Sequence, residues 1–201
     1  MSGNQRLFLL SPASTSGKRA GLLFNPDAPF ELARRLRESG GVPIGEVFSF
    51  LSGLYFRGKL SYARLFANPA GAIRVITSDR GLVSPDQLVT LDDLRAMSRV
   101  PIDHAHDPYR SSLERDARSI AAELSPASEV VLLGSIATDK YIGVLTEVFR
   151  EQLFFPADFV GRGDMSRGGL MLRCAREGRE LDYSAVVTAI RRGARPPRLA
   201  G

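Results

Sequence analysis

The chain has 201 residues, of which 44% are hydrophobic and 24% charged, a balance typical of a globular domain with a substantial core. A single cysteine, Cys174, excludes an internal disulfide and a cysteine-based zinc cluster. With only two histidines as well, we expect no bound metal and no cofactor. No stretch approaches the roughly 20 apolar residues of a membrane span, and the apolar run 7–10 is too short for a signal peptide. We therefore expect a cytoplasmic protein without a membrane partner.

The net charge of +5 is concentrated at the C-terminal end. Residues 162–201 contain nine arginines and four acidic residues, whereas the chain before them is balanced in charge. An arginine-rich end on a neutral body is typical of contact with phosphate or another acidic partner, and a solvated tail is the alternative. No repeat or low-complexity linker divides the sequence, so we predict one domain over 1–201 that ends in this arginine-rich segment.

Three short apolar runs predict β-strands: Arg6–Leu10, Ile73–Thr77 and Val130–Leu133. Around them, apolar residues recur at helical spacing. This spacing predicts helices over 30–37, over 45–67 with possible breaks at Gly53 and Gly58, over 107–124 with Asp107 as N-cap, from 138 or 139 to 149, and around 170–174.

Strands that alternate with helices predict an α/β fold: a mostly parallel sheet flanked by helices, in three layers. Ligands of such sheets bind beyond the carboxyl ends of the strands. This rule selects the three segments that follow the predicted strands, which are 11–19, 78–86 and 134–140.

The first of these segments combines small hydroxyl residues, a glycine and two cations. Backbone amides and hydroxyls can donate hydrogen bonds to a phosphate or carboxylate, and the cations can neutralise it. The spacing is not that of a Walker A loop, and a polar surface turn is the alternative. The predicted ligand-binding residues are Ser11, Ser14, Ser16 and Arg19, with Lys18 as a candidate catalytic residue.

In the second segment, Ser78 and Arg80 are predicted to bind the ligand, because an arginine in a tight turn presents a forked donor. Asp79 and Asp86 are the nearest carboxylates and are therefore candidates for a general base. Both could equally be turn-capping residues.

Lysine is rare in this chain: only Lys18, Lys59 and Lys140 occur, against 24 arginines. A lysine offers a compact charge and a pKa that can fall far enough for proton transfer. Lys140 opens the helix after the third segment and is predicted to bind an anion there. Lys59 is a candidate catalytic residue and Arg57 a ligand-binding one, because both lie among aromatic residues that could stack on bases; a helix core is the alternative for this segment.

The segment 161–169 contains four glycines and two arginines. Glycines let a backbone approach a ligand closely, and arginines grip phosphate. The predicted ligand-binding residues here are Arg162, Asp164, Ser166 and Arg167, although Asp164 or Ser166 could serve only to cap the helix that follows.

Two of these motifs, read in order, resemble the YaaA peroxide-stress family and related YaaA-like domains: Leu9-Leu10-Ser11-Pro12-Ala13 and the segment from Ser78 to Asp86, which runs through Arg80-Gly81-Leu82. The start of the helix at Lys140-Tyr141 follows in the expected order. Ser14 stands where that family carries a lysine, and Arg80 replaces a tyrosine. The resemblance implies DNA association and a role near nucleic-acid damage or modification.

We therefore predict a nucleic-acid-associated protein, with DNA as the expected nucleic acid, that binds a nucleotide or base at the strand ends. An enzyme of DNA base modification or repair that uses lysine and aspartate without metal would fit this prediction. The alternatives are a non-catalytic DNA-binding stress-response protein and an enzyme that acts on free nucleotides.

Overall fold

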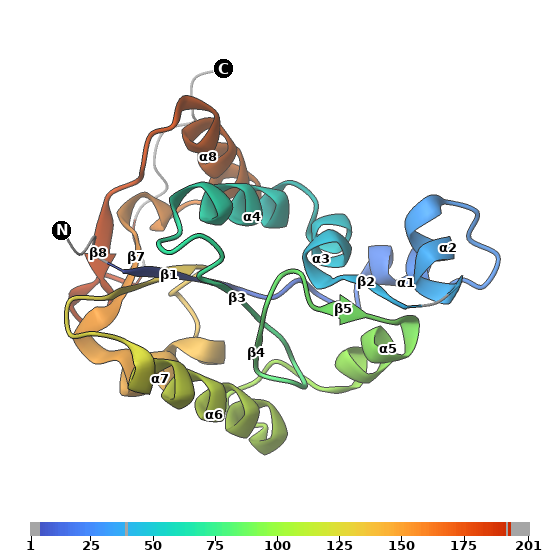
Figure 1. Ribbon diagram of the computed structural model, residues 1–201, viewed down its shortest axis with the longest axis horizontal. Coiled ribbons are helices and arrows are strands. Elements are labelled where there is room, and N and C mark those ends of the chain that lie inside the picture. Colours follow the sequence, from blue (N-terminus) through green and yellow to red (C-terminus); the bar gives the residue numbers. More distant parts are fainter. Residues whose placement is uncertain (1–4, 39, 192, 194–201) are drawn as a thin grey trace.

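A six-stranded sheet forms the centre of the computed structural model, which describes residues 5–38, 40–191 and 193 (Figure 1). The strand order is β4-β3-β1-β6-β7-β8. The four inner strands are parallel to one another, and each edge strand is antiparallel to its neighbour. The strands are β1 (Arg6–Leu10), β3 (Ile73–Ile76), β4 (Leu82–Val83), β6 (Glu129–Leu133), β7 (Leu153–Pro156) and β8 (Tyr183–Ala185).

The two central strands are buried on both faces. In β1 and β6, which pair with Phe8 opposite Val131, all residues from Phe8 to Leu10 and from Val130 to Leu133 are fully buried. Such continuously apolar strands are stable only where helices cover both sides of the sheet. The predicted α/β fold with a mostly parallel, helix-flanked sheet is confirmed.

Helices cover the sheet in two layers. Figure 1 shows α4 (Leu54–Phe66) and α8 (Asp164–Glu177) on one face, and α6 (Asp107–Glu123) and α7 (Asp139–Phe149) on the other. The first pair is in unusually close contact: a Cβ on Gly58 would lie 2.6 Å from the Gly168 carbonyl oxygen, and a Cβ on Gly168 would lie 2.7 Å from the Leu54 carbonyl oxygen. These two glycines therefore set the distance between α4 and α8.

The remaining elements form an outer lobe at one side of the sheet, on the right in Figure 1. In it, β2 and β5 form a small antiparallel ribbon. The lobe consists of α1 (Lys18–Phe24), α2 (Glu31–Glu38), β2 (Val42–Pro43), α3 (Ile44–Ser52), β5 (Leu88–Val89) and α5 (Leu91–Arg99). Three short 3₁₀ helices complete the fold: Arg150–Gln152, Ala157–Phe159 and Val186–Thr188.

The edge strand β4 is closed by a side chain from α6. The backbone N–H of Leu82 donates a hydrogen bond to Asp116 Oδ2 at 2.9 Å. The opposite edge, β8, has only three residues.

The structure corrects two predicted boundaries. The segment 45–67 divides at Gly53, where φ is +59°, and not at Gly58. Gly58 lies inside α4, where the absence of a side chain permits the close contact with Gly168 of α8. The helix that begins at Asp107 has His106 as its N-cap residue, so Asp107 occupies the first turn. There its carboxylate is close to the positive end of the helix dipole.

No helix among the described residues is both long and apolar enough to cross a membrane.

Candidate functional site

The candidate site lies where the connections of the sheet diverge. From β1 the chain continues to β3 on one side, and from β6 it continues to β7 on the other. Adjacent parallel strands with diverging connections leave a crevice at their carboxyl ends, where α/β proteins bind ligands. A cavity of about 800 Å³ opens there, a volume within the range of small-molecule sites. Its wall consists of residues 11–16, 51, 52, 55, 98–102, 135, 138, 140, 141 and 164.

One wall is the turn that follows β1. It contributes Ser11, Ser14, Thr15 and Ser16, of which Ser14 and Ser16 are exposed. The backbone N–H groups of residues 13–16 form no hydrogen bond with the rest of the described chain. Successive free N–H groups in a turn provide a concave surface that favours an anion.

Two cations line the same cavity from different elements. Lys140 lies in the first turn of α7, and Arg99 ends α5. Neither forms an ion pair or hydrogen bond with another described residue. The hydroxyl of Thr138, the N-cap residue of α7, is not used as a cap. The one acidic residue in the wall, Asp164, is exposed and 3.4 Å from Arg167 Nη1. The cavity therefore offers more positive than negative charge.

Lys59 lies directly beneath this cavity and is completely buried. Its Nζ is 2.7 Å from the Ser11 carbonyl oxygen and 2.9 Å from Ser11 Oγ. It also lies over the rings of Tyr55 and Phe56, 4.2 and 4.9 Å from their centroids. Burial lowers the pKa of Lys59 from 10.5 to about 7, and the opposing charges of Asp164 and Arg167 have smaller effects. Near neutral pH this amine therefore exists in both protonation states.

Two tyrosines complete the inner wall. The buried Tyr55 hydroxyl has no hydrogen-bond partner of ordinary geometry among the described residues. The Tyr141 hydroxyl donates to the Ser135 carbonyl at 3.0 Å and accepts from the Ser135 N–H at 3.1 Å. Burial raises the pKa of both hydroxyls, so both stay protonated at neutral pH.

Some of the predicted site residues lie at the cavity, and the others lie outside it. Ser11, Ser14, Ser16, Lys140 and Asp164 line the cavity, and Lys59 contacts Ser11 from below.

The other predicted residues near the first segment lie outside the cavity. Lys18 is exposed at the start of α1. Arg19 donates to the Phe50 carbonyl at 2.9 Å, and with Arg57 it lines a separate, open depression. Sequence position alone had grouped Lys18 and Arg19 with the turn after β1, but α1 carries both away from it. Arg57, predicted together with Lys59, lies on α4 outside the cavity.

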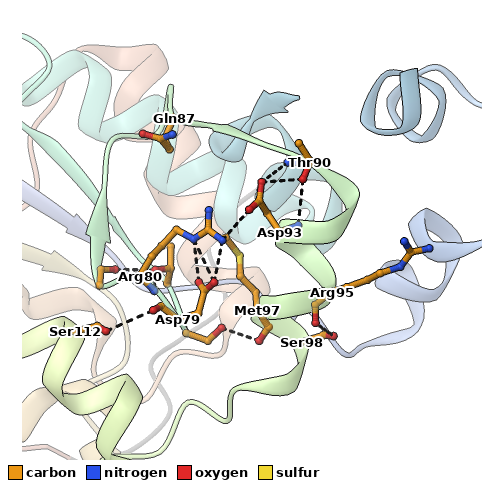
Figure 2. A network of polar contacts seen from close by, with 12 residues as sticks. Asp79, Arg80, Gln87, Thr90, Asp93, Arg95, Met97, Ser98 and Ser112 are labelled. Atoms are coloured by element: carbon orange, nitrogen blue, oxygen red, sulfur yellow. Dashed lines mark hydrogen bonds and ion pairs between the residues drawn. The ribbon is translucent and has the colours of Figure 1, made fainter. Parts of the chain in front are cut away.

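The second predicted segment, 78–86, does not reach the cavity. Figure 2 shows Arg80 between Asp79 and Asp93, at 2.9 and 3.0 Å, while Asp93 also caps α5 together with Thr90. Hydrogen bonds from Thr90 and Arg80 lower the pKa of Asp93. Ser78 Oγ donates to the Met97 carbonyl at 2.7 Å. This network fixes α5, whose end supplies residues 98–102 to the cavity wall.

Asp86 is exposed and pairs with Arg64 at 3.1 Å. It does not line the cavity, so the structure places neither Asp79 nor Asp86 beside Lys59 or Ser11.

The glycine-rich segment forms the beginning of α8 and the turn before it, and of its residues only Asp164 lines the first cavity. Arg162 donates to the Asp158 carbonyl at 2.8 Å and to Ser166 Oγ at 3.3 Å. Arg167 is buried and donates twice to the Phe159 carbonyl, at 3.2 and 3.1 Å. Both arginines line a second cavity of about 340 Å³. Lys18, Lys140 and Arg162 thus do not share one pocket. Of the three segments that follow the predicted strands, 11–19 and 134–140 contribute to the cavity and 78–86 does not.

Several wall residues were not predicted. Arg99 and residues 100–102 follow a helix, not a strand, so the strand-end rule does not select them. Tyr55 has the helical spacing of a core residue, and its position beside the cavity depends on the packing of α4 against α8. The sequence signal that could have identified these residues is Arg99-Val100-Pro101-Ile102, in which a cation is followed by an apolar, proline-containing run that ends a helix.

The fold and this site define an α/β protein with a polar, cationic cavity at a topological switch point. Comparison of the chain with protein-family models, with curated proteins and with solved structures gives no match. The resemblance to the YaaA family therefore stays a prediction. Within the described residues, no group of three histidine, cysteine or acidic side chains is arranged to hold a metal ion.

Proposed function

We propose that the protein binds a nucleotide in the 800 Å³ cavity and acts enzymatically on it. The phosphate would lie against the free N–H groups of residues 13–16, with Lys140 and Arg99 as counter-ions. The base would contact the apolar part of the wall, formed by Leu51, Pro101 and Ile102. Cationic and apolar surfaces in one cavity match the two ends of a nucleotide, its phosphate and its base.

The observation that carries this proposal is the convergence of two cations, neither paired with another described residue, and a hydroxyl-rich turn over Lys59. A buried amine with a pKa of about 7 is suited to proton transfer at neutral pH, and it is costly to maintain for structure alone. This combination supports an enzyme more than a purely DNA-binding protein.

The form of the nucleotide is the second part of the proposal. The cavity has room for one nucleotide unit, so a nucleic acid would have to present an extruded base. Among the described residues of 162–201, Arg162, Arg167 and Arg191 are held by internal contacts, the last by Asp139 at 2.7 Å. Residues 194–201, which hold the last arginines, lie outside the described part. We therefore favour a free nucleotide, with DNA as the alternative.

A ligand screen tests this proposal. Nucleoside monophosphates, nucleosides and a single-stranded oligonucleotide are compared by thermal shift and calorimetry, because a ligand that binds the folded state raises Tm. We expect stabilisation by monophosphates and much less by nucleosides. The Lys140→Ala and Arg99→Ala substitutions should each weaken binding about 10- to 100-fold, since one charge-assisted hydrogen bond contributes about 1.5–3 kcal/mol.

Lys18→Ala is the matched control, because this exposed lysine lies outside the cavity and should leave binding unchanged. Equal affinities of all three variants, or no stabilisation by any nucleotide, would rule the proposal out. Tight binding of the oligonucleotide alone, with a steep dependence on salt, would favour the DNA-binding alternative.

A further inference from the structure

Ser11 differs from the other hydroxyl residues of its turn in what lies behind it. It is the first residue after β1, it lines the cavity, and its Oγ is 2.9 Å from the buried Nζ of Lys59. Ser14 and Ser16 are exposed, and their hydroxyls are 3.5 Å from each other. A serine hydroxyl within hydrogen-bond reach of a buried amine is the arrangement of a nucleophile and its base.

Lys59 also contacts the backbone of Ser11, and this second contact leaves its lone pair available to the Ser11 hydroxyl. Nζ donates to the Ser11 carbonyl oxygen at 2.7 Å, which orients the amine. When the amine is neutral, its lone pair is free to accept the Ser11 hydroxyl proton at the other contact. No carboxylate forms an ion pair with Lys59 among the described residues, so no direct partner fixes its charge.

The surroundings of Lys59 come from three elements. Asp164 and Arg167 on α8 act on it with opposite signs. Tyr55 on α4 and Tyr141 on α7 are the neighbouring titratable groups, and burial raises the pKa of both. Lys59 is therefore the group in this cluster expected to titrate near neutral pH.

We propose that Ser11 is a nucleophile and Lys59 its general base, and that together they cleave a phosphate ester by way of a phosphoserine. This inference rests on the proposed function, because it takes the phosphate of the bound nucleotide as the electrophile. Lys140 and Arg99, which have no ion-pair partner in the described part of the chain, favour a group that is already anionic before reaction, which distinguishes a phosphate ester from a neutral acyl group.

The steps balance without another reagent than water. Ser11 Oγ attacks phosphorus, its proton moves to neutral Lys59, and the bond from phosphorus to the leaving oxygen breaks on the opposite side, where that oxygen takes a proton from water. Water then attacks the phosphoserine from that opposite side and gives up a proton to the solvent. The bond from phosphorus to Ser11 Oγ breaks as the Lys59 ammonium returns its proton to that oxygen, and inorganic phosphate, the free hydroxyl and neutral Lys59 result.

Labelling with a fluorophosphonate tests the dyad in the full-length protein, because this probe loses fluoride to an activated serine. We expect one adduct by intact mass, located on Ser11 by peptide mapping and absent in Ser11→Ala. The rate should rise with pH through about 7, as Lys59 becomes neutral. Lys59→Met should label at least about 100-fold more slowly, the usual contribution of a general base, and without this rise. Ser61→Ala, an exposed serine on the same helix as Lys59, is the control and should label normally.

The outcomes separate the two proposals. No adduct on Ser11, an adduct on another residue, or a wild-type rate independent of pH near 7 would overturn the dyad, while intact nucleotide binding in the thermal-shift screen would leave the proposed function standing. A pH-dependent adduct on Ser11 in a protein that binds no nucleotide would support the dyad and overturn the nucleotide assignment. The wild-type measurements decide the question even if Lys59→Met fails to fold.

Discussion

At the scale of single residues, the complete burial of Lys59 lowers the stability of the folded state. An ammonium group without a carboxylate partner loses its hydration on burial, and two hydrogen bonds to Ser11 replace only part of it. The rarity of lysine and the aromatic residues around it made Lys59 a candidate from the sequence, alongside Lys18, which lies outside the cavity. Its contact with Ser11 could not be predicted, because the two residues are 48 positions apart and only the packing of α4 on the sheet brings them together.

The cost of Lys59 predicts how stability depends on pH. Because the pKa is about 7 in the folded state and 10.5 in the unfolded state, the unfolded chain binds the extra proton between these values. The contribution of this residue is therefore most unfavourable below pH 7 and becomes less so as pH rises towards 10.5. Urea titrations of the wild-type protein between pH 6.5 and 9 should show this rise in the free energy of unfolding.

Lys59→Met should remove most of that rise and stabilise the protein at pH 6.5, where the wild-type cost amounts to a few kcal/mol. Lys18→Met, which changes an exposed lysine, should retain the wild-type slope. Parallel curves for the wild-type protein and Lys59→Met would show that Lys59 is not the group responsible.

At the scale of elements, the helix pair α4–α8 determines which residues meet beside the cavity. The close contact at Gly58 and Gly168 brings Asp164 and Arg167 of α8 near Tyr55 and Lys59 of α4. Helical spacing was sufficient to predict that both segments are helices. It could not predict their contact, and Gly58 was interpreted as a possible break because a glycine in a helix has the same sequence signal whether it interrupts the helix or admits a neighbour.

Adjacent glycines of α8 provide a matched test. A Cβ on Gly168 would lie 2.7 to 2.9 Å from backbone atoms of Leu54 and Tyr55, whereas a Cβ on Gly169 would meet nothing within 4 Å. Gly168→Ala should therefore destabilise the protein by about 1–3 kcal/mol through overpacking. Gly169→Ala should stabilise it by up to about 1 kcal/mol through helix propensity. Chemical denaturation measures both, and equal effects would contradict this description of the interface.

At the scale of the whole molecule, the cavity lies between the sheet and the outer lobe, and the network in Figure 2 joins the two. Arg80 follows β3 and reaches Asp93 on α5 at 3.0 Å. We expect Arg80→Met to release α5 and thereby residues 98–102 of the cavity wall. Nucleotide affinity should fall several-fold although residue 80 does not line the cavity, and hydrogen exchange at 98–102 should become faster.

Arg95→Met is the corresponding control. Arg95 lies on α5, and among the described residues its side chain pairs only with the exposed Asp92, at 2.8 Å. This variant should retain both the affinity and the exchange rates. An unchanged affinity in Arg80→Met would show that the lobe holds its position without this network.

The layered fold was predictable because it depends on short-range signals: continuously apolar runs for β1 and β6, and helical spacing between them. In the outer lobe, helical spacing predicted α2 and α3, but the ribbon was not predictable, since it has two residues in each strand and carries no periodic signal. The same limit applies to the site. Ser11, Lys140 and Asp164 follow from strand ends and helix starts, whereas Arg99 enters the cavity only through the position of the lobe.

The hydrogen bond from Leu82 to Asp116 has a consequence for association with other chains. An open sheet edge is a template on which a strand of a second molecule can add, and this is a common route to fibrils. Here one margin is capped by a helix-borne carboxylate and the other is only three residues long. Strand addition is therefore disfavoured, and assembly with a second copy or with another macromolecule should use helices and turns.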